Sequence, residues 1–175
     1  MQEPISIPAI GEKLKNSIII RQFQPPDQDS VFKIYKEALK DLGLLNENRS
    51  NPANFEEIQK TYLDNNGDFL VAEIDGIIVG TGGYNPDSKQ SDTAVIRRMY
   101  TLPEYQHQGI GRKILAQLEG SIKQRPQYNQ ISLFTAKEMP NAAKLYISMG
   151  YTKAGKQPQD GFIFQKTLYP LTVRR

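Results

Sequence analysis

The stretch RRMYTLPEYQHQGIGR, residues 97–112, decides the fold of this chain. Its first five residues continue the β-branched and apolar run that begins at Thr93, which predicts a strand over 93–101, whereas the apolar spacing that follows predicts a helix over 109–123. Between them stand Gly109 and Gly111, which let the backbone turn without a Cβ in the way. Because the first N–H groups of a helix have no intrahelical acceptor and carry about half a positive charge, this junction predicts a site for phosphate or pyrophosphate.

Two common phosphate-binding motifs fail at single positions. The Rossmann fingerprint needs a third glycine where Ile114 stands. The segment 150–157 (GYTKAGKQ) is close to the Walker A pattern, but it ends in Gln157 where Ser or Thr would bind magnesium. The next residues, 158–161 (PQDG), favour a turn where a P-loop requires a helix. The glycine junction, with Arg112 as an added cation, therefore stays the predicted phosphate site.

The rest of the chain predicts a mixed α/β fold. The predicted elements are a strand at 17–24, a helix from Asp27 that stops at Gly43, a helix opened by the capping-box pair Asn54 and Glu57, strands at 69–74 and 77–84 joined by Asp75-Gly76, strands at 93–101 and 130–136, helices at 109–123 and 140–149, and strands at 151–156 and 161–168. We expect a single domain over 17–175, with a mixed central sheet of six to seven strands and about four flanking helices. Residues 1–16 show no sustained periodicity and are predicted to form an N-terminal arm.

Composition excludes several classes of protein. The 175 residues suit one domain, and a hydrophobic content of 38% is enough for a core. The absence of cysteine and the single histidine, His107, exclude a disulfide scaffold, a thiol nucleophile and a His- or Cys-rich metal site. A net charge of +3 is too small to imply nucleic acid. Without a long apolar run or the pattern of a signal peptide, we expect a cytoplasmic protein with no membrane partner.

Two segments together resemble the GNAT acetyltransferase superfamily. Residues 97–112 resemble its acyl-CoA-binding motif, a strand and a proline-containing turn followed by Arg/Gln-x-x-Gly-x-Gly/Ala. Residues 142–151 (AAKLYISMGY) resemble its Ala-x-x-Leu-Tyr-x-x-x-Gly-Phe/Tyr segment. They occur in the family's order, about 30 residues apart, and the predicted elements over about 17–168 also match the family's fold. Neither motif is specific alone, but the pair is.

The resemblance implies transfer of the acetyl group of acetyl-CoA to a primary amine by direct attack, without a metal. In the family, the strand before the glycine loop splays from its parallel neighbour and pairs with the pantetheine arm, and the loop amides hold the pyrophosphate. The implied cofactor-binding residues are Met99, Tyr100, Thr101, Gln106, His107, Gln108, Gly109, Ile110, Gly111, Arg112 and Asn141. Tyr146 occupies the place of the tyrosine that protonates the CoA sulfur, although its apolar stripe would equally suit a core aromatic residue.

The sequence departs from the family at the positions where a general base is usually found. Val95 and Phe134 stand where relatives carry an acid. A water chain, Glu73, Glu138 or another acid would then have to take the proton of the amine, and the sequence does not choose between them. Met139 replaces a family asparagine that contacts CoA, and Asn141 follows two residues later.

Two rival functions stay open from the sequence. One is an acyltransferase that uses a different acyl-CoA, since the acyl pocket cannot be read from the residues. The other is a GNAT-fold module that binds CoA without turnover, which the apolar Val95 and Phe134 slightly favour and which Tyr146 and the intact glycine loop disfavour. The acceptor is expected to be a small-molecule or peptide amine, and a homodimer is left open.

Overall fold

The computed structural model describes residues 17–46, 57–157 and 161–169, except for the side chains of Lys156 and Gln157. The predicted arm at 1–16 and the capping position Asn54 lie outside the described residues.

The described residues build one seven-stranded sheet in the order β1-β2-β3-β4-β5-β7-β6. The strands are β1 (Ile19–Gln22), β2 (Asp68–Ile74), β3 (Ile77–Pro86), β4 (Thr93–Thr101), β5 (Gln130–Ala136), β6 (Thr152–Gln157) and β7 (Gly161–Thr167). Among these strands, β4 and β5 form the one parallel pair, and all other neighbours are antiparallel. A parallel pair needs a crossover connection, and α2 (Ile110–Lys123) provides it. The predicted mixed sheet with a central β-α-β unit is confirmed.

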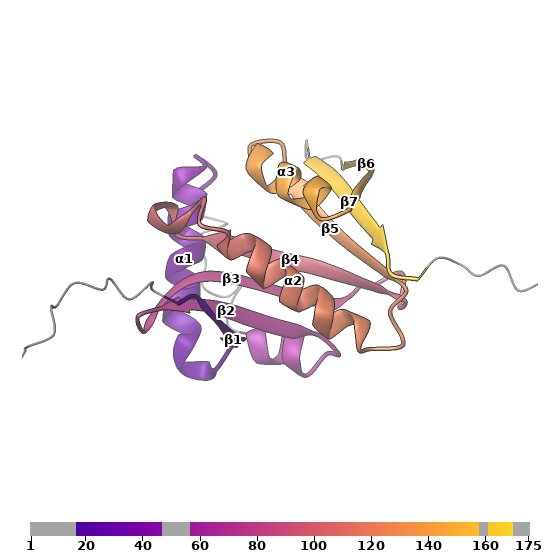
Figure 1. Ribbon diagram of the computed structural model, residues 1–175, viewed down its shortest axis with the longest axis horizontal. Coiled ribbons are helices and arrows are strands. Elements are labelled where there is room, and N and C mark those ends of the chain that lie inside the picture. Colours follow the sequence, from indigo (N-terminus) through magenta and orange to yellow (C-terminus); the bar gives the residue numbers. More distant parts are fainter. Residues whose placement is uncertain (1–16, 47–56, 158–160, 170–175) are drawn as a thin grey trace, which may run out of the picture.

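Helices cover both faces of the sheet (Figure 1). The helical segments are α1 (Gln28–Asp41), α2, α3 (Pro140–Ser148), the π-helical turn η3 (Gln59–Leu63) and the 3₁₀ turns η1 (Pro25–Asp27) and η4 (Pro103–Tyr105). The adjacent residues Gly82 and Gly83 of β3 face opposite sides of the sheet, and each lies close to the helices or core residues of its side. A Cβ at Gly82 would collide with Ile114 of α2, whereas one at Gly83 would collide with Phe69, which packs with α1 and η3.

The core consists of two clusters on opposite faces of β2, β3 and β4. The larger cluster joins the sheet to α2 and α3, and its fully buried members include Ile114, Leu115, Leu118, Ile122, Ile131 and Tyr128. The smaller cluster joins β2 to α1 and η3 through Phe23, Val31, Tyr35, Leu39, Ile58, Tyr62, Phe69 and Val71. The buried positions of α1 and α2 follow the helical spacing of apolar residues in the sequence.

Strand β4 changes partners along its length. Its pairing with β5 ends at Ile96 opposite Leu133, whereas β5 continues to Ala136 with β7 on its other side. The pairing of β4 with β3 is interrupted by a bulge after Arg97, and Arg98 there has a φ of 60°. Beyond this point β4 and β5 diverge, as Figure 1 shows. The divergence implied by the family resemblance is thus present.

The predicted elements match the structure best in the centre of the chain. The bounds 93–101 and 130–136 are those observed for β4 and β5. The first strand is shorter than predicted, 19–22 in place of 17–24, because its pairing with the sheet covers only Ile19–Gln22. The described part of the second predicted helix is a single π-helical turn, although its apolar residues Ile58 and Tyr62 are buried as that pattern requires.

Candidate active site

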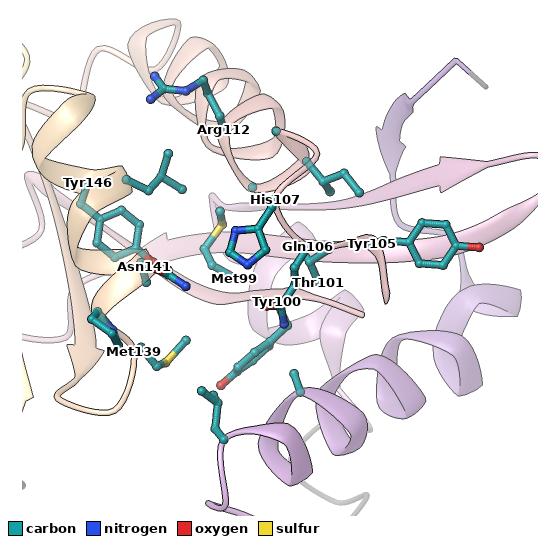
Figure 2. A pocket seen from close by; sticks show the side chains of 18 of the residues that line it. Met99, Tyr100, Thr101, Tyr105, Gln106, His107, Arg112, Met139, Asn141 and Tyr146 are labelled. Carbon is teal, nitrogen blue, oxygen red and sulfur yellow. The ribbon is translucent and has the colours of Figure 1, made fainter. Parts of the chain in front are cut away.

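A cavity of about 360 Å³ lies where β4 and β5 diverge. Its walls come from the end of β4, the glycine loop with the start of α2, the turn before α3, α3 itself and the C-terminal part of α1 (Figure 2). The predicted site residues that line it are Met99, Tyr100, Thr101, Gln106, His107, Gly109, Ile110, Gly111, Arg112, Asn141 and Tyr146. Segments more than 40 residues apart in the sequence are therefore brought to one place, as the resemblance implies.

The backbone of the glycine loop is shaped to direct N–H groups at this cavity. Both His107 and Gly109 have left-handed backbone conformations, with φ of 61° and 79°. Gly109 is the N-cap of α2, and the first intrahelical bond runs from the Lys113 N–H to the Gly109 carbonyl. The N–H groups of the first turn therefore have no acceptor within the helix, and they stand at the positive end of a 14-residue helix dipole.

The polar side chains of the loop do not all face the cavity. The Arg112 guanidinium donates a hydrogen bond to the Ser148 hydroxyl of α3 at 2.6 Å, and Figure 2 shows it turned away from the cavity centre. The Gln108 amide donates to the Glu104 carbonyl, and Gln108 is absent from the residues that line the cavity. In Figure 2 the His107 imidazole projects toward the middle of the cavity. In this structure Arg112 joins α2 to α3, and the N–H groups of the first turn of α2 have no acceptor within the helix.

Tyr146 is buried on α3 with its ring against the cavity wall. Its side chain is only 4% exposed, and its ring packs against Tyr151 and Phe164 with centroids 6.1 and 5.8 Å away. Burial raises the pKa of the Tyr146 hydroxyl above its ordinary value, and the nearby Tyr100 raises it further. At neutral pH the hydroxyl is therefore protonated and available as a hydrogen-bond or proton donor.

A partly buried ion pair contacts the end of α3 that follows Tyr146. The Lys166 ammonium of β7 donates to Glu119 of α2 at 2.8 Å and to the carbonyl of Met149 at 2.8 Å. Met149 is the C-cap of α3, so three elements meet at one cation. Such a cation satisfies helix-terminal carbonyls that would otherwise lack a donor. Sequence reasoning missed this contact because the three residues are far apart in the chain.

The structure separates the two acids considered for the amine's proton. Glu73 on β2 accepts a hydrogen bond from the Arg21 guanidinium at 2.9 Å and does not line the cavity. Glu138, in the turn between β5 and α3, does line it. The apolar Val95 is buried in β4, and Phe134 on β5 is 43% exposed. Glu138 is therefore the candidate that the geometry retains.

Sequence reasoning also missed the wall supplied by α1. Ala38 and Leu42 lie on the same side of the cavity as Tyr100, and they follow the ordinary apolar spacing of a core helix. Nothing in that spacing distinguishes a residue that contacts the core from one that contacts a cavity. Only the packing of α1 beside β4 reveals the difference.

Comparison with known proteins agrees with this geometry. The family model described as Acetyltransferase (GNAT) family matches residues 29–151, which is most of the chain. The chain belongs to the GNAT family of acetyltransferases. Its α/β domain with a seven-stranded mixed sheet is the fold expected from the resemblance.

Curated relatives of this GNAT protein include N-acetyltransferases of animals and bacteria. It is 30% identical over 120 residues to "Probable N-acetyltransferase camello" of Xenopus tropicalis, a match that covers 68% of this chain and 54% of that protein. It is 24% identical over 138 residues to "Uncharacterized N-acetyltransferase YjgM" of Escherichia coli, covering 77% and 82%. The chain thus spans about half the length of the Xenopus relative.

Solved structures share the fold of this GNAT protein at low sequence identity. YncA, a putative acetyltransferase of Salmonella typhimurium solved with acetyl-CoA, superposes with a TM-score of 0.77 at 20% identity, over 91% of this chain and 99% of that one. The PaiA N-acetyltransferase of Thermoplasma acidophilum, solved with coenzyme A, gives 0.74 at 21% identity, over 86% and 99%.

The described residues were also compared with the requirements of a membrane-spanning helix and of a metal site, and they meet neither. No helix in the described ranges has the length and apolar character needed to cross a bilayer. No group of three or more His, Cys, Asp or Glu side chains in the same residues is arranged to hold a metal ion.

Proposed function

We propose that this GNAT protein is an N-acetyltransferase that moves the acetyl group of acetyl-CoA to a primary amine. One observation carries the proposal: a single cavity joins the N-terminus of α2, the end of β4 that lacks a β5 partner, and the buried hydroxyl of Tyr146. These are a receptor for phosphates, a backbone edge for an extended arm and a proton donor. The relatives named above as N-acetyltransferases support the same function.

The residues present fit coenzyme A. The first residues of α2 and its N-cap Gly109 line the cavity, and a Cβ at Gly109 would meet no atom within 4 Å. A Cβ added at Gly111 would lie 3.4 Å from the Leu145 side chain, which is ordinary contact. We infer that the amides of 108–112 hold the pyrophosphate and that the backbone of Met99, Tyr100 and Thr101 receives the pantetheine arm.

Acetyl-CoA, when bound, supplies a thioester whose carbonyl carbon an amine can attack. The neutral amine forms the C–N bond, and the C–S bond then breaks with its electron pair leaving on sulfur. We propose that Tyr146 gives its hydroxyl proton to that sulfur and regains one from the nitrogen, so that the enzyme returns to its starting state. Since the chain has no cysteine to carry an acyl group, attack takes place directly in the ternary complex.

Two features of the proposal rest on the sequence. We propose a cytoplasmic location and a domain that spans residues 17–175, as expected from the sequence.

Transfer of another acyl group stays as the second candidate function, because the part of the cavity beside Tyr146 is lined mainly by apolar residues such as Met99 and Leu145 that would accept a longer chain.

The proposal is tested by turnover with acetyl-CoA and a panel of primary amines. We expect release of free CoA thiol to depend on the amine, with a product heavier by one acetyl group in mass spectrometry. Propionyl-CoA and longer acyl-CoAs in the same assay test the second candidate. Tight CoA binding in calorimetry without turnover on any amine would contradict the proposal and favour a non-catalytic module.

A further inference from the structure

The cavity has two ends of different chemistry. At one end lie the N–H groups of the first turn of α2, with Arg112 close by. At the other end, beside α1, lie Ala38, Leu42 and Met139 with the ring of Tyr100. Figure 2 shows this separation, with Arg112 far from Met139 and Tyr100. If the phosphates occupy the first end, the second end is left for the acceptor.

The acceptor end holds one carboxylate among apolar groups. Among the described residues that line the cavity, Glu138 is the only acidic one, and it immediately precedes Met139. The turn that carries it is closed by a hydrogen bond from the Met139 N–H to the Ala136 carbonyl at 3.1 Å. This turn connects β5 directly to the N-cap of α3, so Glu138 is held at the rim of the site rather than on a long loop.

Arg98 and Arg112 both have partners in the structure. The Arg98 guanidinium lies over the ring of Tyr35 at 5.2 Å from its centroid, and Arg98 does not line the cavity. Arg112 is bonded to Ser148. Arg112, the one lysine or arginine among the described residues that line the cavity, lies at the opposite end, so an acceptor that carried a carboxylate beside its amine would meet Glu138 with no lysine or arginine of the lining beside it to offset the repulsion.

We propose that the acceptor is a primary amine on a compact apolar body, and that its ammonium group pairs with Glu138, which takes one proton from it so that the neutral nitrogen attacks. The inference rests on the proposed function and names the substrate class of the same site. The apolar body would pack against Ala38, Leu42 and Met139, as ligand sites commonly combine an apolar wall with a few polar groups. An amino acid or another zwitterion of equal size would be a poorer acceptor.

The proposal is tested with two acceptors that differ only by a carboxylate, 2-phenylethylamine and phenylalanine. We expect the wild-type protein to show kcat/KM at least about tenfold higher for the amine than for the amino acid, the size of one charge-assisted contact. In Glu138→Gln, the KM for 2-phenylethylamine should rise about tenfold while the affinity for acetyl-CoA in calorimetry is unchanged. In Glu138→Lys, the preference between the two acceptors should be reduced or reversed.

A charge change at the far end of β4 serves as the matched control. Asp92 is exposed, precedes β4 and lies outside the cavity lining, so Asp92→Asn and Asp92→Lys should leave the preference at the wild-type value. A wild-type protein that acetylates both acceptors equally, or a Glu138→Gln variant with an unchanged KM, would overturn the inference but leave the proposed function standing. Absence of turnover on every amine would instead overturn the proposed function.

Discussion

The two halves of β4 differ in their neighbours and in what those neighbours permit. From Thr93 to Ile96 the strand has β3 on one side and β5 on the other, and all four of its residues are buried. From Arg97 to Thr101 it keeps β3 but loses β5, and none of its residues is fully buried. The first half completes the sheet, whereas the second half leaves a backbone edge facing the cavity.

The bulge after Arg97 and the glycine opposite it explain where the change takes place. A bulge adds one residue to β4, bends the strand and increases its local twist. Gly82 makes room on the α2 face, since a Cβ there would collide with the sulfur of Met99. Buried pairing therefore governs stability in one half, and an open edge governs ligand binding in the other. Variants on each side should separate the two properties.

The largest expected effect comes from a substitution in the cavity beside the half of β4 that lacks a β5 partner. Tyr146→Phe keeps the ring and its packing on Tyr151 and Phe164 but removes the proton donor. We expect kcat to fall by about 10²–10⁴, with the melting temperature and the affinity for acetyl-CoA near their wild-type values. Steady-state kinetics on an acceptor for which chemistry limits the rate checks this. A kcat within about twofold of wild type would show that Tyr146 is only a core aromatic residue.

On the side of the paired half, a truncation should change stability alone. Ile131 is fully buried on β5 and pairs with Ala94 of β4. Ile131→Ala should lower the free energy of unfolding by about 2–5 kcal/mol through lost burial and the cavity left behind. The measurement is chemical denaturation, combined with calorimetric titration of CoA at a temperature where the variant is folded. A large loss of CoA affinity in the folded variant would contradict the separation of the two halves.

The glycine loop offers a variant that should change binding alone. Gly111→Glu places a carboxylate among the N–H groups at the start of α2, and we expect CoA to bind about 100-fold more weakly, which is about 2.7 kcal/mol. Gly120→Glu is the matched control, because Gly120 lies on the same helix, is exposed, and an added Cβ there meets no atom within 4 Å. The control should bind CoA as the wild type does. Equal CoA affinity in Gly111→Glu and the wild type would place the phosphates elsewhere.

The smallest expected effect concerns Tyr84 of β3, which pairs with Ile96 in the half of β4 that keeps both neighbours. The Tyr84 hydroxyl lies 3.0 Å from the Ser121 hydroxyl of α2, and burial raises the pKa of Tyr84. Tyr84→Phe should cost about 1 kcal/mol of stability at pH 8 and leave kcat unchanged. Equilibrium unfolding of both proteins measures the first effect, and a fall of kcat like that of Tyr146→Phe would contradict the distinction between the two tyrosines.

The same variant has a pH dependence of defined sign. A tyrosine whose pKa is raised by folding stabilises the protein fully below about pH 10, the pKa in the unfolded chain. That contribution is lost as pH rises from there toward the pKa of the folded state. The free energy of unfolding should therefore fall above about pH 10, and less steeply in Tyr84→Phe than in the wild type. Equal slopes for the two proteins in unfolding at pH 9 and pH 11 would contradict this prediction.

Local patterns predicted an element well where two independent signals in the sequence indicated it. The strand at 93–101 combines β-branched residues with a following turn, and the helix at 109–123 combines two glycines with apolar periodicity; both elements are observed within one residue of those bounds. The second predicted helix is helical in its described part, but its hydrogen bonding at Gln59–Leu63 is π-helical, which apolar spacing that also suits an α-helix does not reveal. The short first strand is set by its pairing with β2, which local sequence does not contain.

By itself the sequence determined the order of elements, the glycine loop and the tyrosine on α3, because turn chemistry and hydrophobic periodicity are properties of neighbouring residues. The tertiary structure alone decided which acid faces the cavity. The sequence does not distinguish Glu73 from Glu138, but Glu73 on β2 is paired with Arg21 of β1, whereas the β5–α3 turn places Glu138 in the lining of the cavity. It also decided that Arg112 bonds to Ser148, 36 residues away. Contacts between distant segments depend on how the sheet and helices pack, which no local pattern records.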